Sequence, residues 1–345
     1  MRSITIRDVA ERAGVSVGTV SNALNRPEIV ATETRQQILR AIDEIGYIRN
    51  SPARQLRGAR SSAIGLVVLD IDNPFFTDVA RGVDAVASMV DHLVILCSSG
   101  GGRTREDRQL RLLEEQRVTG VLMTPTGRRA SNLHDKVRAR GTPIVLLDRR
   151  SSRRDHCSVA VDDVEGGQLA ARHLTELGHT RIALINGPLG ITQFRDRRNG
   201  FVTGLEGAGL SLAVANDIEM GSVTPAITAA IADGEEAANR LLQQRKPPTA
   251  IFCANDLFAL GVEHAILKSG RRLPDDVAVI GYDDVPFAAL AFVPLTSVRQ
   301  PSYELGYRGA QLLLEESSGG SHRHEHVTFT PELVVRDSTV GADAA

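Results

Sequence analysis

The chain has 345 residues, of which 42% are hydrophobic and 24% charged, so it is long enough for two or three domains with sizeable cores. No apolar run approaches the ~18 residues that a membrane-spanning helix needs, and no basic-then-apolar secretion signal opens the chain. The sequence therefore predicts a cytoplasmic protein with no membrane partner. Its three cysteines, Cys97, Cys157 and Cys253, lie inside apolar runs without a metal-binding spacing, which favours buried thiols in a reducing compartment.

Charge is distributed unevenly along the chain. Residues 1–60 contain ten arginines, no lysine and six acidic residues, a balance of +4, whereas the remaining 285 contain 30 basic and 36 acidic residues, a balance of −6. The two balances add to the net charge of −2. A basic head on an acidic body indicates a polyanion-binding module joined to a second domain. Chance variation over sixty residues is the simpler alternative, and charge alone does not decide between them.

The first domain, residues 1–49, is expected to form three short helices. Thr5, Ser16 and Thr32 are suitable N-cap residues for them. The Gly-x-Ser-x-Gly pattern at 14–18 resembles a nucleophile elbow, but that motif needs a strand before it, and here a helix precedes it. A helix-turn-helix is therefore favoured over catalysis. The apolar residues at helical spacing that would form its core are Ile6, Val9, Ala10, Ala13, Val20, Ala23, Leu24, Ile38, Ala41, Ile42 and Ile45.

Short apolar strands alternate with helical stretches from Ser61 onward, which is typical of parallel sheets covered on both faces. One set of strand-like runs lies between residues 63 and 163, and a second between 181 and 284. The predicted fold class is α/β, with two doubly wound lobes behind a small all-α head. Ligands bind such sheets at the carboxyl ends of the strands. Polar residues expected there are Asp70, Asp72, Asp148, Asp162, Asn255, Asp256 and Asp283.

The segment 50–60 has the residues of a very short helix. Ser51 suits the N-cap, Pro52 the first helical position and Gly58 the stop, which leaves a helix of about six residues. Isolated helices shorter than ~12–15 residues are marginal in water. The segment is therefore either a plain linker or a helix that forms only against a partner, and its three arginines make DNA a suitable partner.

Two further motifs carry weaker signals. The Gly-rich run at 98–103 is not a phosphate loop, because no Lys-Ser or Lys-Thr pair follows it. The alternating histidines of 322–326 (His-Arg-His-Glu-His) have a spacing that suits a metal ion, but the simpler interpretation is a solvated loop before a strand. No resident metal or cofactor is expected.

Several motifs, given at the end of this paragraph, make the sequence resemble the lactose-repressor (LacI/GalR) family of bacterial transcription regulators. The resemblance covers nearly the whole chain, in order, and implies a helix-turn-helix head (1–49), a hinge helix (50–60) and an effector-binding and dimerisation body (61–345) similar to periplasmic sugar-binding proteins. Lobe one is expected at about 61–161 and 292–323, and lobe two at about 162–291 and 324–340. The motifs are TIRDVAERAGVSVGTVSNALN, YIRNSPARQLRG, IGLVVLDIDNPFF, LLDRR, VDDVEGG, HLTELGHTRIALINGP, RDRRNGF, FCANDLFALG and VAVIGYDD.

The resemblance implies that residues 16–25 are the recognition helix in the major groove of a palindromic operator. There Val17 can meet a thymine methyl and Asn22 can pair with adenine, whereas Gly18 replaces a long polar side chain of other members. Leu56 matches the leucine that wedges into the minor groove, with Ala53 beside it. The remaining expected DNA contacts, which position the head on phosphates, are Thr5, Ser16, Thr19, Ser21 and Asn25.

The same resemblance implies a small-molecule effector between the two lobes. Carboxylates and a guanidinium facing each other across aromatic rings suit vicinal hydroxyls, so a sugar is expected, with a nucleobase or nucleoside as the alternative. Phe75 and Phe76 would otherwise be core residues, and Asp256 would otherwise cap the following helix. The expected effector-binding residues are Asp72, Phe75, Phe76, Asp148, Arg149, Arg197, Asn255 and Asp283.

Competing functions are a cytoplasmic sugar-binding protein without operator binding, and an α/β enzyme. The basic first 60 residues disfavour the former, and the lack of a phosphate loop or placed catalytic triad disfavours the latter. Family members are usually homodimers, and some become tetramers through a C-terminal leucine heptad. This chain ends in RDSTVGADAA without such a repeat, so we expect a homodimer. Its interface is predicted around Phe76 to Met89 and Leu110 to Leu113.

Overall fold

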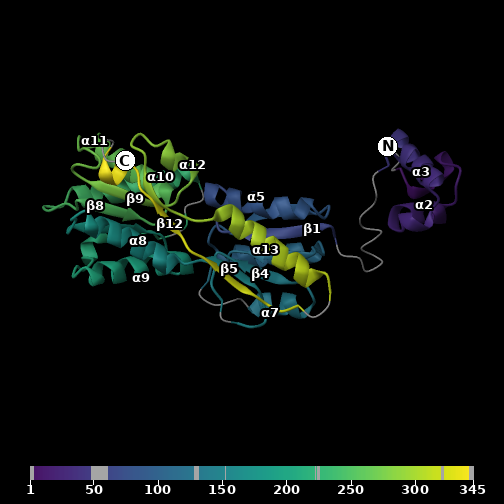
Figure 1. Cartoon of the computed structure of the whole chain (residues 1–345), viewed down its shortest axis with the longest axis horizontal. Coiled ribbons are helices and arrows are strands. Elements are labelled where there is room, and N and C mark those ends of the chain that lie inside the picture. Colours follow the sequence, from purple (N-terminus) through teal and green to yellow (C-terminus); the bar gives the residue numbers. More distant parts are fainter. Residues whose placement is uncertain are drawn as a thin grey trace. The chain divides into compact units, whose positions relative to one another are not determined.

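The computed structural model describes residues 4–47, 61–127, 132–151, 153–221, 223, 226–319 and 322–341. The chain divides into two compact units, Met1–Ser61 and Ser62–Ala345 (Figure 1). The expected hinge helix, with Ala53 and Leu56, lies outside the described residues. Among those that are described, no helix is both long and apolar enough to cross a membrane.

The head is a bundle of short helices whose ends follow local capping chemistry. The Asp8 carboxylate accepts hydrogen bonds from the backbone N–H and the hydroxyl of Thr5, each 2.7 Å long. Ser16 caps the second helix by accepting from the N–H of Thr19 at 3.0 Å. The expected cap at Thr32 is wrong, since Ala31 is the N-cap and Thr32 is already helical. The elements are α1 (Ile6–Arg12), α2 (Val17–Asn25), η1 (Pro27–Ile29) and α3 (Thr32–Ile45).

One apolar face from each helix forms the core of the head. Val9 of α1, Val20 of α2 and Ile38 of α3 have no exposed surface and meet at its centre. Gly14 and Gly46 have φ angles of 63° and 65°, which only glycine adopts without strain, and they let the chain leave α1 and α3 sharply. The predicted core is confirmed.

The body consists of two doubly wound α/β lobes, as the sequence predicts. Lobe one has a parallel sheet in the order β11-β5-β4-β3-β1-β2. Its elements are β1 (Ala63–Val68), α5 (Pro74–Ser88), β2 (Leu93–Ser98), α6 (Arg103–Glu115), β3 (Gly120–Met123), α7 (Asn132–Ala139), β4 (Ile144–Leu147), β5 (Ser158–Val161), α13 (Ser302–Ser317) and β11 (His326–Phe329).

Lobe two repeats this arrangement, with the sheet order β12-β10-β9-β8-β6-β7. All neighbours in it are parallel except β10 and β12, which are antiparallel. Its elements are α8 (Asp163–Glu176), β6 (Ile182–Asn186), α9 (Thr192–Gly207), η2 (Val214–Asn216), β7 (Asp217–Glu219), α10 (Ile227–Leu242), β8 (Ala250–Cys253), α11 (Asp256–Lys268), β9 (Ala278–Asp283), α12 (Pro286–Ala289), β10 (Thr296–Arg299), β12 (Glu332–Val334) and α14 (Asp337–Val340).

The last two lobe boundaries differ from the expected ones. The segment 292–299 was expected in lobe one, but β10 pairs with β9 and completes the sheet of lobe two. The segment 324–329 was expected in lobe two, but β11 pairs with β5 at the edge of lobe one. Strand pairing decides these boundaries. Because the partner strands are distant in the sequence, the local sequence does not predict which strands pair.

Helices α5 and α13 cross closely on lobe one (Figure 1). A Cβ atom at Gly82 would lie 2.1 Å from the carbonyl oxygen of Tyr303, and one at Gly306 would lie 2.0 Å from that of Val79. The Ser302 hydroxyl also donates a 2.6 Å hydrogen bond to Asp78. These contacts hold α13 against α5, the helix whose first turn contains Phe75 and Phe76. Helix α13 is the first lobe-one element after the chain returns from lobe two.

Candidate functional site

The carboxyl ends of strands from both lobes meet around two adjoining small cavities. In each sheet the first strand lies between the second and the third, and this reversal of strand order is where α/β sheets bind ligands. The cavities have volumes of about 40 and 50 Å³. The residues that line one or both are Leu69, Asp70, Asn73, Phe75, Phe76, Asp148, Pro188, Gln193, Phe194, Arg197, Val223, Ala230, Asn255, Leu257, Phe258 and Asp283.

Two aspartates are held in unusual backbone conformations at this cleft. Asp148 follows β4 with a φ of 52°, and Asp283 ends β9 with a φ of 104°. Residues other than glycine rarely adopt such φ angles, and strained residues of this kind cluster at binding sites. Burial and the charge of Asp163 raise the pKa of Asp148. Burial also raises the pKa of Asp283 to about 6, although the Arg197 charge acts in the opposite direction.

Arg197 of α9 is the central cation of the cleft, with only 4% of its surface exposed. Its Nε donates to Asp163 at 2.7 Å, and its Nη1 donates to the carbonyl of Ala254 at 2.6 Å and lies 3.5 Å from Asp283. The guanidinium also stacks over the ring of Tyr282 at 3.8 Å. Burial alone would lower the pKa of Arg197, but the surrounding carboxylates raise it above its ordinary value.

Two amide side chains join the lobes directly across the cleft. Asn73 of lobe one donates to Asp283 of lobe two at 3.2 Å. Gln193 of lobe two donates to the backbone carbonyl of Asp148 of lobe one at 2.5 Å and to its carboxylate at 3.0 Å. Because these bonds use the same side chains that line the cavity, a ligand that occupies it competes with the contacts between lobes.

A second surface with functional character is the outward face of α2 in the head. Val17 is 42% exposed, and Gly18 and Asn22 are also exposed, while Val20 points into the core. The Asn25 amide donates to the backbone carbonyl of Ser21 at 2.8 Å, so it is engaged at the end of its own helix. The α2 face therefore offers small side chains and two exposed amides, of which that of Asn25 is engaged.

Comparison with known proteins agrees with this division into a helical head and a two-lobed body. Residues 5–50 match the model for bacterial regulatory proteins of the lacI family, and residues 171–339 match a periplasmic binding protein-like domain. The HTH-type transcriptional repressor PurR of Photobacterium profundum is 32% identical, over 97% of this chain and 98% of its own. The PurR of Haemophilus influenzae (strain PittEE) is 33% identical, with the same shares covered.

The chain belongs to the lacI family. It is a transcriptional repressor with a DNA-binding helix-turn-helix and an effector-binding domain. Its fold is similar to that of a lac repressor dimer bound to operator and the anti-inducer ONPF, with a TM-score of 0.84, 28% identity and coverage of 98% of this chain and 99% of that one. It is also similar to the regulator CelR in complex with cellobiose, with a TM-score of 0.70, 31% identity and coverage of 97% and 99%.

The repressor's cleft brings together most of the residues expected there. Asp148, Arg197, Asn255 and Asp283 line the smaller cavity together with Phe75 and Phe76, which also belong to the lobe-one core. Asp72 and Arg149 are absent from the lining of both cavities. Asp72 is exposed, and Arg149 donates to the carbonyl of Gly127 at 2.5 Å.

The sequence analysis missed several cleft residues of the repressor, among them Asn73, Gln193 and Phe194. Each adjoins a motif that was identified, Asn73 before the Phe75-Phe76 pair and the other two just before Arg197. Position next to such a motif on a helix N-terminus was the available signal. The alternative role given to Asp256 is also wrong, because Asn255 is the helix cap and Asp256 accepts from Val285 and Ser297.

A larger pocket of about 380 Å³ lies outside the repressor's inner cleft, between α5 and the segment after β9. Two ion pairs line it, Arg81 with Asp78 and Arg336 with Asp284, and it shares Phe75 and Asp283 with the lining of the cleft. The inner cleft differs in position, because the carboxyl ends of strands from both lobes converge on it. The inner cleft is therefore the candidate effector site.

Proposed function

We propose that this repressor acts in the cytoplasm as a homodimer on a palindromic operator, and that a sugar in the interlobe cleft switches its affinity for DNA. The observation that carries the proposal is the pair of hydrogen bonds across the cleft, from Asn73 to Asp283 and from Gln193 to Asp148. A ligand whose hydroxyls take over these partners changes the arrangement of the lobes. No catalytic step is part of this function.

Sugar chemistry suits the polar groups of the cleft. Asp148 and Asp283 can accept from hydroxyls, while the amides of Asn73 and Gln193 can both donate and accept. The Asp148 oxygen Oδ1 is buried without a hydrogen-bond partner among the described residues, so it is available to a ligand hydroxyl. The similarity to the CelR–cellobiose complex supports the same ligand class.

The cleft must open to receive a sugar. Pockets for small ligands usually have ~300–1,000 Å³, far more than the two cavities of about 40 and 50 Å³. Opening separates Asn73 from Asp283 and Gln193 from Asp148, so the ligand acts on the lobes through its different affinity for the open and closed states. Lobe one begins at β1, directly after the hinge segment, and its movement is thus transmitted along the chain to the head.

The proposed dimer uses apolar surface that the single chain leaves exposed. Leu93 is 74% exposed and Leu96 42% exposed on β2, an edge strand, and exposed apolar edges normally pair with a second chain. Met89 beside it is 70% exposed, and Phe292 in lobe two is 86% exposed. Within the predicted interface, Phe76, Leu110 and Leu113 are buried in the single chain, whereas Met89 and Leu112 are exposed, so we add β2 to the proposed interface.

The operator contacts follow from the exposed face of α2. We assign base contacts to Val17 and Asn22, and phosphate contacts to Thr5, Ser16, Thr19 and Ser21. Gly18 contributes backbone only. The Asn25 amide donates to the backbone carbonyl of Ser21, so it can contact phosphate only after that hydrogen bond breaks. Because few direct base contacts are available, the hinge residues Ala53 and Leu56 carry much of the proposed specificity.

A thermal-shift screen tests the effector class. A ligand present at ~100 times its dissociation constant stabilises the native state by about 2.7 kcal/mol, which is readily measured. We expect stabilisation by one or a few mono- or disaccharides, and none by nucleobases or nucleosides. Stabilisation by a nucleobase alone would refute the sugar assignment. The matched variants Gln193→Ala, in the cleft, and Gln168→Ala, on α8, should respectively lose and keep the shift.

A further inference from the structure

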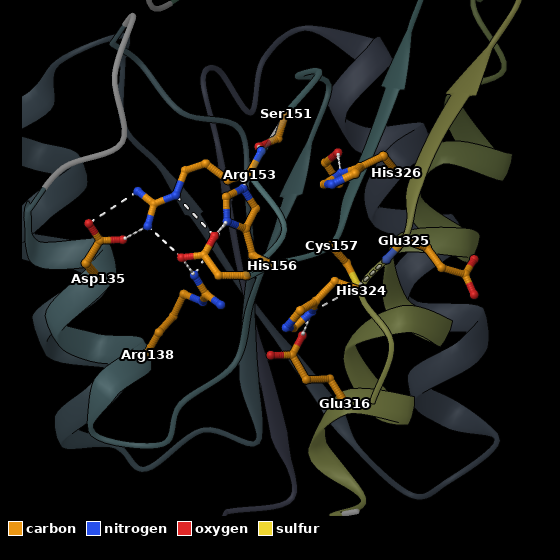
Figure 2. A network of polar contacts seen from close by, with 12 residues as sticks. Asp135, Arg138, Ser151, Arg153, His156, Cys157, Glu316, His324, Glu325 and His326 are labelled. Carbon is orange, nitrogen blue, oxygen red and sulfur yellow. Dashed lines mark hydrogen bonds and ion pairs between the residues drawn. The ribbon is translucent and has the colours of Figure 1, made fainter. Parts of the chain in front are cut away.

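A second cluster of chemically active side chains lies at the amino edge of the lobe-one sheet (Figure 2). The cleft lies at the other ends of these strands. Cys157 directly precedes β5, and Glu316 lies in the last turn of α13. His322 and His324 come from the extended segment that leads into β11. Three separate chain segments thus place one sulfur, two imidazoles and one carboxylate together.

The four ligand atoms lie within 4.8 Å of one another. The Cys157 Sγ is 3.1 Å from the Nε2 of His322 and 3.7 Å from the Nδ1 of His324. The Nδ1 of His324 is in turn 3.8 Å from the Oε2 of Glu316. Ligands around a tetrahedral zinc ion, with metal bonds of ~2.0–2.3 Å, are about 3.3–3.6 Å apart, so a small contraction or expansion of this cluster meets that geometry.

The backbone explains why these particular side chains converge. Side chains alternate along an extended chain, so His322 and His324 point to one side and Arg323 and Glu325 to the other. The inward histidines are partly buried against Cys157, which corrects the interpretation of this segment as a solvated loop. The backbone N–H of Glu325 also donates to the Cys157 sulfur at 3.4 Å, a contact that stabilises a thiolate.

The charged groups around the cluster have partners of their own, although the charge of Arg138 also acts on the carboxylate of Glu316. Arg138 pairs with Asp155 at 3.1 Å, and Glu325 pairs with Arg308 at 2.8 Å. His326 bonds the Ser158 hydroxyl at 2.8 Å. By contrast, the Oε2 of Glu316 is buried without a hydrogen-bond partner among the described residues, and it points at His324 (Figure 2).

We propose that Cys157, Glu316, His322 and His324 bind one divalent transition-metal ion, with zinc as the ion that matches the donor set best. A thiolate, two neutral imidazoles and a carboxylate carry two negative charges, which a divalent cation neutralises. Mixed sulfur, nitrogen and oxygen donors favour zinc over magnesium or calcium, which prefer oxygen alone. With all four positions filled by the protein, the site is structural.

The location predicts what the ion does. It ties the end of α13 and the start of β11 to β5, and these are the parts of lobe one that return from lobe two. An ion that binds the folded chain but not the unfolded chain stabilises the folded state. The ion therefore increases the stability of the lobe-one edge. The site lies outside the effector cleft, so its existence is independent of the function proposed above.

Cobalt substitution tests the site in the full-length protein. The purified chain is treated with a chelator, titrated with Co²⁺ and then with Zn²⁺, and followed by absorption. We expect one cobalt per chain, visible bands of a four-coordinate ion, a thiolate-to-cobalt charge-transfer band in the near ultraviolet, and loss of all these bands on adding Zn²⁺. A six-coordinate spectrum without the charge-transfer band would overturn the proposal.

Matched variants assign the ligands. Cys157→Ser and His324→Ala should lower Zn²⁺ affinity by at least roughly 10–100-fold, the range seen when only supporting groups of a metal site are removed. Cys97→Ser and His264→Ala, at a different cysteine and an exposed histidine, should leave it unchanged. Equal Zn²⁺ affinity of Cys157→Ser and Cys97→Ser would refute the site.

Discussion

Arg197 shows how one residue can serve both the fold and the site. It lies on the lining of the cleft, yet its guanidinium neutralises Asp163 and approaches Asp283, both buried. Removing one partner of a buried ion pair leaves an uncompensated charge, at a cost of roughly 3–5 kcal/mol. A binding residue of this kind contributes to stability even when no ligand is bound.

We therefore expect Arg197→Ala to abolish the effector response and to lower the free energy of unfolding, while operator binding survives at low temperature. Arg198→Ala is the matched control, because Arg198 is the next residue of the same helix, is partly exposed and pairs with Asp217 of β7. Calorimetric titration with the effector and urea denaturation measure the two effects. A mutant that responds at the normal effector concentration would remove Arg197 from the site.

Asp283 gives the cleft a dependence on pH. Its pKa is about 6 in the folded protein against an ordinary 3.8, so between these values the folded state holds a proton that the unfolded state releases. The free energy of unfolding must then fall as the pH rises from about 4 to 6, by on the order of 2–3 kcal/mol. Asp283→Asn should lack this fall, as urea denaturation at several pH values would show. Parallel profiles for the two proteins would contradict the assignment.

At the scale of elements, the hinge is the most informative segment to change. Leu56→Ala should weaken binding to the operator by at least about tenfold, because opening a base step costs a few kcal/mol that the leucine wedge offsets. Binding to random DNA and to the effector should be unchanged, since a helix this short is expected to form only against the specific site. Titrations on both DNAs measure this, and an equal loss on the two would show that the hinge does not confer specificity.

The exposed edge strand β2 predicts the oligomeric state. Leu93→Asp should convert the dimer to a monomer at micromolar concentration, because a charge would be buried in an apolar interface. Leu177→Asp is the control, a leucine exposed to a similar extent as Leu96 but at the end of α8 in lobe two. Light scattering distinguishes the outcomes. A stable tetramer of the unmodified chain, or an unaffected Leu93→Asp dimer, would show that β2 is not the interface.

Elements whose signals are local could be predicted from the sequence, and those that depend on distant partners could not. The helices of the head and the buried strands were predictable because caps and apolar periodicity lie within a few residues. The placement of β10 and β11 depends on pairing with β9 and β5. Likewise, Asn73 and Gln193 became site residues only because the opposite lobe supplies Asp283 and Asp148. Cys157 and His324 are 167 positions apart, and only the sheet brings them together.

For the whole molecule, electrostatics should dominate the affinity for DNA. Two heads with a charge balance of +4 each could neutralise on the order of 6–10 phosphates, which implies a loss of ~10³–10⁵ in affinity between 50 and 200 mM salt. The acidic body opposes non-specific binding to the same polyanion. Fluorescence anisotropy on a labelled operator at several salt concentrations measures the slope, and an affinity that hardly changes over this range would contradict DNA binding through the basic head.

The central claim is that the cleft and the operator are coupled through the arrangement of the lobes. It is tested most directly by measuring operator affinity without ligand and with a saturating concentration of the sugar found in the thermal-shift screen. We expect a change of ~5–150-fold, and the operator must change the affinity for the sugar by the same factor. An operator affinity that is the same with and without the saturating sugar would contradict the account.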